Sequence, residues 1–203
     1  EWRAYTDHPF VRALSDGSMP QACFRHYLAQ DYLFLFHLAR AYGLAAYKAD
    51  ELEDIRQAAA GLTAIIDVEI SLHVAFSARW GLSETDMAAS EEDAATMAYS
   101  RYVLETGLRG DLLDLRVALA PCIVGYAEIG AGLAADPGTA MDANPYREWI
   151  EMYSSDDYQD VARAEVAGLD GLMERRGGES RFESLAAIFR QATRLEAAFW
   201  ESG

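Results

Sequence analysis

The stretch LLDLRVALAPCIVGYAEIGAGL, residues 112–133, decides the fold of this 203-residue chain. Its only charged residues are Asp114, Arg116 and Glu128, and most of the other positions are apolar. A helix that is apolar on most of its sides is buried among other elements, whereas a surface helix keeps a polar face. The stretch therefore predicts a central helix against which the rest of the chain packs.

A proline, a thiol and a tyrosine lie close together in this helix. Pro121 removes one backbone donor and crowds the preceding turn, so we expect the helix to be kinked or loosened there. Cys122 and Tyr126 are four residues apart and share a face. Two interpretations follow. Cys122 is a nucleophile on the floor of a pocket, or it is a small core residue, as free cysteines commonly are.

Length and charge restrict the remaining possibilities. The chain is 51% hydrophobic and 25% charged, and its length predicts a single domain over residues 1–203. A net charge of −16 argues against nucleic acid and membranes as partners, because phosphates and anionic lipids repel an acidic surface. No run reaches the roughly 18 uncharged apolar residues of a spanning helix. Two cysteines without a paired-cysteine motif favour a reducing, cytoplasmic location.

Turn residues divide the chain into long segments without the alternation typical of strands. We therefore predict an all-α fold, a multi-helix bundle with short antiparallel connections. The expected helices cover residues 2–14, 21–47, 50–79, 90–108, 111–134, 145–153, 157–175 and 180–201. The chain starts in what reads as the middle of a helix, so we expect a short N-terminal piece to be missing.

An acid interrupts an aromatic stripe in the second of these helices. The stripe consists of Phe24, Tyr27, Asp31 and Phe34. An unpaired buried carboxylate is costly, so Asp31 needs a partner, either protein or ligand. The alternative is a partly exposed Asp31 that pairs with an arginine such as Arg25 or Arg40. The last helix repeats the pattern, with Glu196 on the same face as Phe199 and Trp200.

Glu69 and His73 are four residues apart on one helix. Such a pair binds a metal only with further ligands; otherwise it is an ion pair or an orienting hydrogen bond. No HExxH motif and no repeated Glu-x-x-His pair is present. Acids and aromatic residues on several helices instead suit a flat, nitrogen-rich aromatic ligand. Aromatic side chains would stack on its faces, and carboxylates would bind its amino and ring-nitrogen groups.

Taken together, the motifs resemble the TenA/thiaminase II family, whose fold is the haem-oxygenase-like helical bundle. The resemblance covers nearly the whole chain, and Cys122 places it with the members that have a pocket cysteine. Its segments are HPFVRALSDGSMP at 8–20, FRHYLAQDYLFL at 24–35, Glu69 to His73, AYSRYVL at 98–104, APCIVGYAEIG at 120–130, PYREWIEMYSS at 145–155 and LEAAFW at 195–200.

This resemblance implies a hydrolase of thiamin salvage. The implied substrate is 4-amino-5-aminomethyl-2-methylpyrimidine, which loses ammonia and becomes the hydroxymethyl pyrimidine; thiamin is the implied second substrate. No cofactor and no metal are implied, and a homo-oligomer, tetramer or dimer, is expected. Two alternatives remain: an iron-dependent oxidase of the same fold, for which the further ligands are not found, and a non-catalytic pyrimidine binder.

The resemblance also implies roles for individual residues. Cys122 matches the nucleophile, Glu196 the acid/base carboxylate, and Asp31 the acid that binds the pyrimidine and, on our mechanism, stays ionised. We expect Glu196 to protonate the ring nitrogen as the thiolate adds and then to activate water. The implied pocket walls are Phe34, Tyr99, Tyr126, Tyr153 and Phe199. Phe34 stands where some members have tyrosine, so that wall lacks a hydroxyl.

Overall fold

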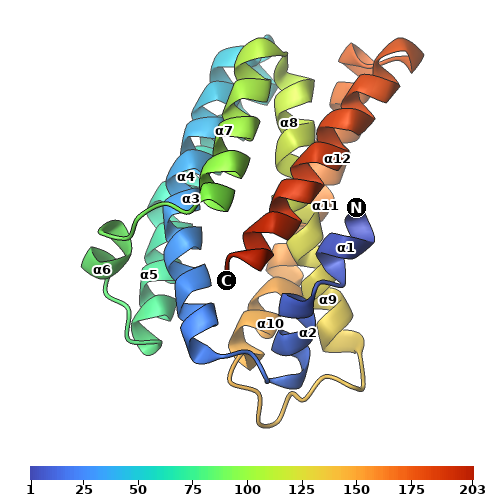
Figure 1. Ribbon diagram of the computed structural model, residues 1–203. Coiled ribbons are helices and arrows are strands. Elements are labelled where there is room, and N and C mark those ends of the chain that lie inside the picture. The colour runs from blue at the N-terminus through green and yellow to red at the C-terminus, as the bar shows by residue number, and fades with distance from the viewer. The chain divides into compact units, whose positions relative to one another are not determined.

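A computed structural model describes residues 1–203, and all of its regular elements are helices (Figure 1). The helices form two compact units. The first contains Glu1–Pro20 and Val117–Glu201, and the second contains Gln21–Arg116 with Ser202–Gly203. The division falls inside one helix, α8 (Leu112–Ala120), which runs on without interruption through η2 (Pro121–Gly125) and α9 (Tyr126–Ala135).

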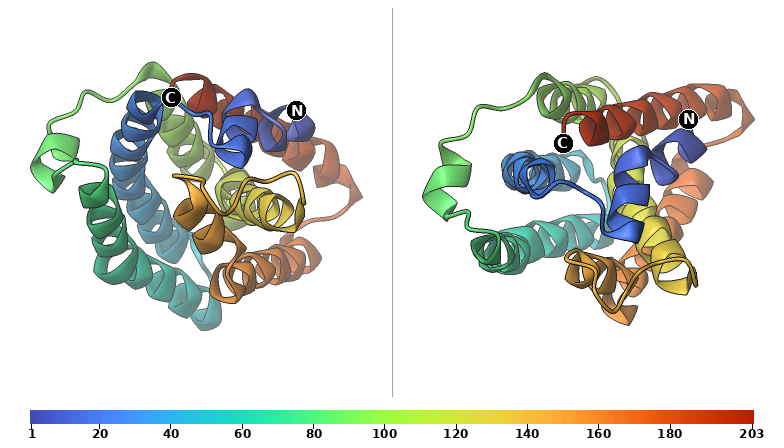
Figure 2. Two further views of the ribbon diagram at one scale, coloured as in Figure 1. Left: turned by 90° about the horizontal axis from the view of Figure 1, so that it is seen from below. Right: turned by 60° about the horizontal axis from the view of Figure 1, so that its bottom comes forward.

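The second unit is built around its longest helix, α3 (Gln21–Lys48). Buried side chains occur on nearly every side of its first half, because it packs against four other helices and η1. Figure 2 shows α3 flanked by α5 and α7. The remaining elements of this unit are α4 (Leu52–Ala64), η1 (Ile65–Glu69), α5 (Ile70–Arg79), α6 (Glu84–Ala88) and α7 (Ala94–Arg109).

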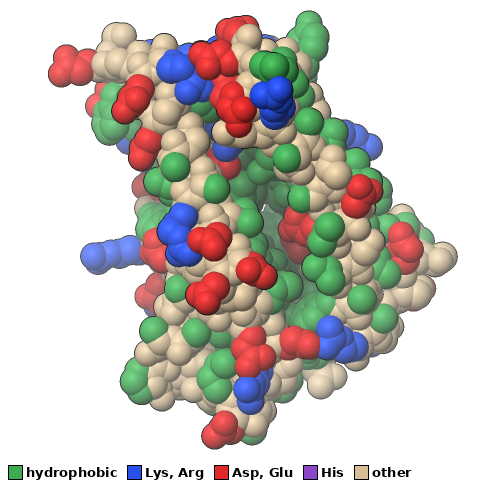
Figure 3. All heavy atoms as spheres, turned by 180° about the vertical axis from the view of Figure 1, so that it is seen from behind, with side chains coloured by type: hydrophobic (Ala, Val, Ile, Leu, Met, Phe, Trp, Pro, Cys, Tyr) green, Lys and Arg blue, Asp and Glu red, His purple; other side chains and the backbone are tan.

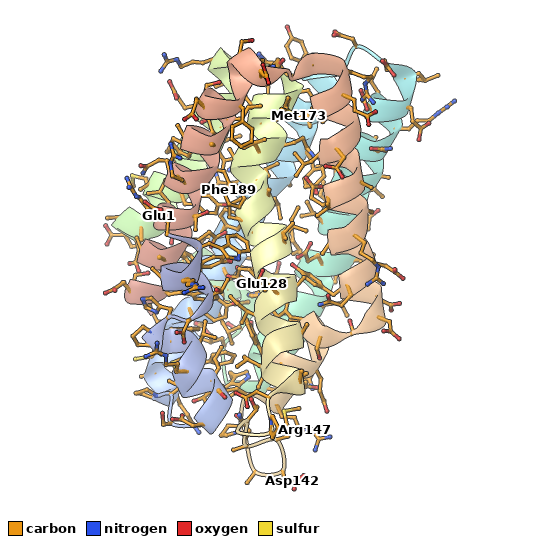
Figure 4. All side chains as sticks on the ribbon, turned by 90° about the vertical axis from the view of Figure 1, so that its right-hand side faces the viewer. Glu1, Glu128, Asp142, Arg147, Met173 and Phe189 are labelled. Atoms are coloured by element: carbon orange, nitrogen blue, oxygen red, sulfur yellow. The ribbon has the colours of Figure 1, made fainter.

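The first unit places η2 and α9 among its other helices. α9 packs against α10 and α11, while η2 packs against α11 and α12 (Figure 4). The predicted central helix is therefore confirmed as a largely buried one. The other helices of this unit are α1 (Trp2–Thr6), α2 (Pro9–Asp16), α10 (Arg147–Ser154), α11 (Asp156–Arg176) and α12 (Glu179–Glu201).

The prediction of one helix over residues 2–14 is wrong. α1 ends at Thr6 and α2 begins at Pro9. Proline disfavours helical backbone in the residue before it, and it suits the first position of a helix. His8 accordingly has extended backbone, and its Nδ1 accepts a hydrogen bond from the Phe10 amide as the N-cap of α2.

Two further boundaries differ from the prediction. The helix predicted to begin at residue 90 begins at Ala94, since the buried Gln30 amide holds the preceding backbone in an extended loop. The short helix α6 was not predicted. Ser83 and Asp86 form a reciprocal capping box at its start, and Ser155 caps α11.

Two helical stretches are long and apolar enough to cross a membrane by length and composition alone, when up to two charges are allowed. Leu112–Ala135 is 67% buried over its most apolar window, as the core helix of a globular protein would be. Leu52–Arg79 is only 11% buried there and exposes several apolar side chains. On the face seen in Figure 3, acidic side chains are more frequent than basic ones, in line with the net charge of −16.

Candidate functional site

Cys122 lies where the central helix loosens. Residues Pro121–Gly125 form a π-helical turn between the two α-helical parts, which confirms the loosening predicted at Pro121. π-Helical turns inside α-helices are frequent at functional sites, because the extra residue turns side chains away from the regular face. The Cys122 thiol is partly accessible, and Sγ donates a hydrogen bond to the Leu119 carbonyl, 3.0 Å away.

Tyr5 holds this π-helical turn in place. Its hydroxyl donates to the carbonyl of Pro121 at 3.2 Å, and its ring is completely buried. A Cβ on Gly125 would lie 2.2 Å from the ring, so the close approach requires glycine. The ring also stacks on Trp200 of α12, with centroids 6.0 Å apart. Tyr5 thus ties η2 to α12. The sequence analysis missed it because no local pattern marks it.

Glu196 and Phe199 lie on α12, the helix that packs against η2. Glu196 is 2% exposed and Phe199 4% exposed, so a carboxyl and an aromatic ring are both buried in the first unit. Both come from the helix that contacts the Cys122 segment. The structure therefore brings the elements of the predicted nucleophile and the predicted acid/base carboxylate into contact.

The predicted wall residues Tyr126 and Tyr153 belong to one aromatic cluster of the first unit. Their ring centroids are 4.9 Å apart, and Trp149 and Trp200 also contact Tyr126. Tyr153 lies in the last turn of α10, close to Ser155, which links α10 to α11. Gly130 of α9 lets α10 approach closely, because a Cβ there would lie 2.6 Å from the Tyr153 carbonyl carbon.

The outer surface of this unit carries a groove whose lining includes Ala127 and Ala162, two members of the apolar cluster against which Cys122 packs. Its volume is about 410 Å³, and it runs between η2–α9 and α11. Glu128 at its edge accepts hydrogen bonds from the Trp2 indole at 3.0 Å, and Trp2 stacks on Phe189 of α12 (Figure 4). None of the predicted site residues lines it.

In the second unit, Asp31 is nearly buried and lies beside a histidine. Its Oδ2 is 3.5 Å from Nδ1 of His73, and its side chain is 13% exposed. The alternative of an arginine partner is wrong, since Arg25 donates to the Gly81 carbonyl and Arg40 lies against His37. Burial raises the pKa of Asp31 to about 7, so the free carboxyl holds its proton to a higher pH than an exposed aspartate does.

Glu69 and His73 complete this cluster. Glu69 ends the π-helical segment η1, and His73 follows one turn later in α5. Glu69 stays accessible to solvent, yet the surrounding protein raises its pKa to about 7, and the Asp31 charge adds to the rise. Burial lowers the pKa of His73. The spacing of Glu69 and His73 marks them as a pair, but their link to Asp31 is not visible in the sequence, because that contact joins α5 to α3.

Phe34 and Tyr99, two further predicted wall residues, stack on each other in this unit. Their rings are nearly parallel, with an interplanar angle of 6° and centroids 5.3 Å apart, and both side chains are buried. Asp31 and Phe34 lie on adjacent turns of α3, so the acid and the ring stack belong to one helix face. No group of three or more His, Cys, Asp or Glu residues that could hold a metal ion occurs in residues 1–203.

Comparison with known sequences gives full-length matches. A family model described as the TENA/THI-4/PQQC family matches residues 1–203. An aminopyrimidine aminohydrolase of Halalkalibacterium halodurans is 38% identical, covering 98% of this chain and 88% of its own length. A Haemophilus influenzae protein named only as uncharacterized is 39% identical, over 100% of this chain and 93% of its own.

Solved structures give the same result. A protein of Silicibacter sp., titled a TenA family transcription regulator, superposes with a TM-score of 0.92 at 42% identity, covering 98% of this chain and 89% of its own. A Shewanella denitrificans domain described as having a heme oxygenase-like fold gives 0.76 at 15% identity, covering 98% and 85%. The predicted all-α, haem-oxygenase-like fold is confirmed.

Proposed function

The chain belongs to the TENA/THI-4/PQQC family, and we propose that it is an aminopyrimidine aminohydrolase of thiamin salvage. It would convert 4-amino-5-aminomethyl-2-methylpyrimidine and water into the hydroxymethyl pyrimidine and ammonia, and cleave thiamin as a second substrate. The Halalkalibacterium halodurans relative, which is named an aminopyrimidine aminohydrolase, supports this reaction. It is 38% identical, and the match covers 98% of this chain and 88% of the relative. The observation that carries the mechanism is a thiol on a π-helical turn packed against the helix of a buried glutamate.

Cys122 supplies the nucleophile in this proposal. Its thiolate adds to the pyrimidine ring while a ring nitrogen takes up a proton, and the electron pair of the ring then expels ammonia from the methylene carbon, which carries a protonated amino group. Water adds to that carbon and gives up a proton. Departure of the thiolate and of the proton on the ring nitrogen restores the aromatic ring. Covalent catalysis of this kind divides one difficult displacement into two easier steps.

Glu196 is the proposed proton carrier. The Cys122 thiol donates to a backbone carbonyl in the free protein, so its proton has to pass to the Glu196 carboxylate before the sulfur can attack. A buried carboxyl on the adjacent helix can deliver a proton to the ring nitrogen and later remove one from water. Glu196 is protonated before it delivers the proton to the ring nitrogen and ionised before it takes one from water. It therefore returns to its starting state after each cycle.

The remaining residues bind the substrate in this proposal. The Asp31 carboxyl accepts hydrogen bonds from the 4-amino group, and aromatic rings contact the faces of the pyrimidine. The proposed wall residues are Phe34, Tyr99, Tyr126, Tyr153 and Phe199. Tyr99, Tyr126 and Tyr153 also bring hydroxyl groups, whereas Phe34 contributes only a ring.

Ammonia release from the aminomethyl pyrimidine tests the proposal, with thiamin loss measured in parallel. Cys122→Ser should abolish turnover and still show a thermal shift with the pyrimidine, because binding does not need the thiol. Cys23→Ser is the matched control, since Cys23 is the other partly accessible cysteine and has no proposed role. Turnover retained in Cys122→Ser would refute covalent catalysis, and a thermal shift without turnover in the wild type would indicate a binding protein.

We also propose a cytoplasmic homo-oligomer. The two free cysteines suit a reducing compartment. The α4–η1–α5 stretch exposes Leu52, Ile66, Val68 and Leu72, each more than half accessible, and several exposed apolar side chains on one helical stretch favour an interface with another copy. Light scattering after size-exclusion chromatography should give a multiple of 22.4 kDa, reduced in Leu72→Glu and unchanged in the control Phe182→Glu. A monomeric wild type would refute it.

A further inference from the structure

The hydrogen bonds of His73 fix which of its ring nitrogens carries a proton. Nε2 lies 2.9 Å from the Leu28 carbonyl oxygen, which can only accept, so Nε2 carries hydrogen. Burial lowers the pKa of His73, which favours the neutral ring. In the neutral ring, Nδ1 then presents a lone pair, and this lone pair lies on the side of Asp31.

A lone pair and a carboxylate repel each other, so a proton is needed between Nδ1 and Oδ2. The two atoms are 3.5 Å apart, and an approach of about 0.5 Å brings them to hydrogen-bond distance. Burial favours the protonated form of Asp31, which can donate that hydrogen bond. The Asp31–His73 pair is thus neutral as a whole, either as carboxylic acid with imidazole or as carboxylate with imidazolium.

Other groups in this unit act on the pair. Glu69 of η1 lies near Asp31, and a charge on either carboxyl disfavours a charge on the other. The Tyr32 ring stacks on the imidazole with centroids 6.2 Å apart, and its hydroxyl is occupied by Glu84. Both side chains of the pair are nearly buried, at 13% and 10% exposure.

We propose that His73 is a positioning residue that shares one proton with Asp31 and stores it while the substrate is bound. This inference rests on the proposed function, since it assumes that Asp31 receives the amino group of an aminopyrimidine. When that amino group donates to Asp31, the proton moves from Oδ2 to Nδ1, and the imidazolium donates back to the carboxylate. No bond to carbon changes, and the proton is not released to solvent.

The free protein tests the shared proton without any substrate. Nitrogen-15 NMR of the histidine rings should show that Nε2 of His73 carries hydrogen. The chemical shift of Nδ1 should be that of a nitrogen that is unprotonated or accepts a hydrogen bond, and it should change in Asp31→Asn. His37 is the matched control, because it lies in the same unit against Glu92 and Arg101. A His73 ring with hydrogen on Nδ1 alone, or one insensitive to Asp31→Asn, would overturn the inference whatever the protein's activity.

Ligand binding gives the second test. Calorimetric titration with the hydroxymethyl pyrimidine in buffers of different ionisation enthalpy should show little net proton release by the wild type between pH 6 and 8. In His73→Gln the proton of Asp31 must go to solvent, so pyrimidine binding should release one proton. The affinity of this variant should therefore fall by up to about tenfold for each pH unit below pH 7. His37→Gln should behave as the wild type.

The failures of the two proposals are distinguishable. If the wild type binds no pyrimidine, the proposed function fails, while the NMR result on the free protein still decides whether the pair shares a proton. If the pyrimidine binds and His73→Gln keeps the pH dependence and proton balance of the wild type, the storage role is refuted and the proposed function stands.

Discussion

Gly130→Ala should separate two helices that the native backbone brings into direct contact. A Cβ at Gly130 would lie 2.6 Å from both the carbonyl carbon and the Cβ of Tyr153, and 2.8 Å from its carbonyl oxygen. Two of these atoms belong to the backbone, so no side-chain rotation can make room. Since carbon atoms pack best at about 3.5–4.0 Å, α9 and α10 have to move apart by about 1 Å.

The cost of this separation follows from two opposing effects. Overpacking of a filled interior costs about 1–3 kcal/mol. Replacing a glycine within a helix by alanine gains up to about 1 kcal/mol of helix propensity. Gly132→Ala is the matched control, because it makes the same change in the same helix with nothing within 4 Å of the new methyl group. The difference between the variants therefore isolates the steric cost.

Urea unfolding measures this difference. We expect Gly132→Ala to be as stable as the wild type or more so, and Gly130→Ala to be less stable than Gly132→Ala by about 1–3 kcal/mol. Ammonia release should fall only in Gly130→Ala, since Tyr153 moves with α10. Equal free energies of unfolding for the two variants would refute the reasoning, because they would show that the helix contact tolerates a methyl group.

Three further perturbations test other parts of the structure. Gln30→Ala should cost about 1–3 kcal/mol in urea unfolding, since the Asp93 amide and Thr96 hydroxyl lose their buried acceptor; near-wild-type stability would contradict this. Ser155→Ala should cost about 0.5–2 kcal/mol by the same assay, because its hydroxyl caps the Tyr158 amide of α11; an unchanged midpoint would speak against it. The raised pKa of Asp31 means that the folded protein keeps a proton that the unfolded chain loses above about pH 4, so stability should fall as the pH rises from 4 to 7. Asp31→Asn should reduce this fall between pH 4 and 7, and an unaltered pH dependence would rule the explanation out.

Some of the fold followed from local chemistry alone. Pro121 lacks an amide hydrogen, so the central helix had to loosen there, and the structure has a π-helical turn at that place. The hydroxyls of Ser83 and Ser155 bond amides within three residues, which is why both caps were predictable. The break at His8–Pro9 was also readable from the proline, although the prediction ran a helix through it.

The sequence by itself determined that the fold is all-α and which helix is the most apolar. It also contains the cysteine, the acids and the aromatic residues to which the family resemblance gives roles in catalysis and binding. Only the tertiary structure decided which partner each group has. The hydroxyl of Tyr5 reaches Pro121 across 116 residues, and His73 lies against Asp31 from another helix. Periodicity reports the face on which a side chain lies, because helical neighbours are three or four residues apart. It carries no information about which helix packs on that face, and this choice places His73 beside Asp31 and raises the pKa of the carboxyl.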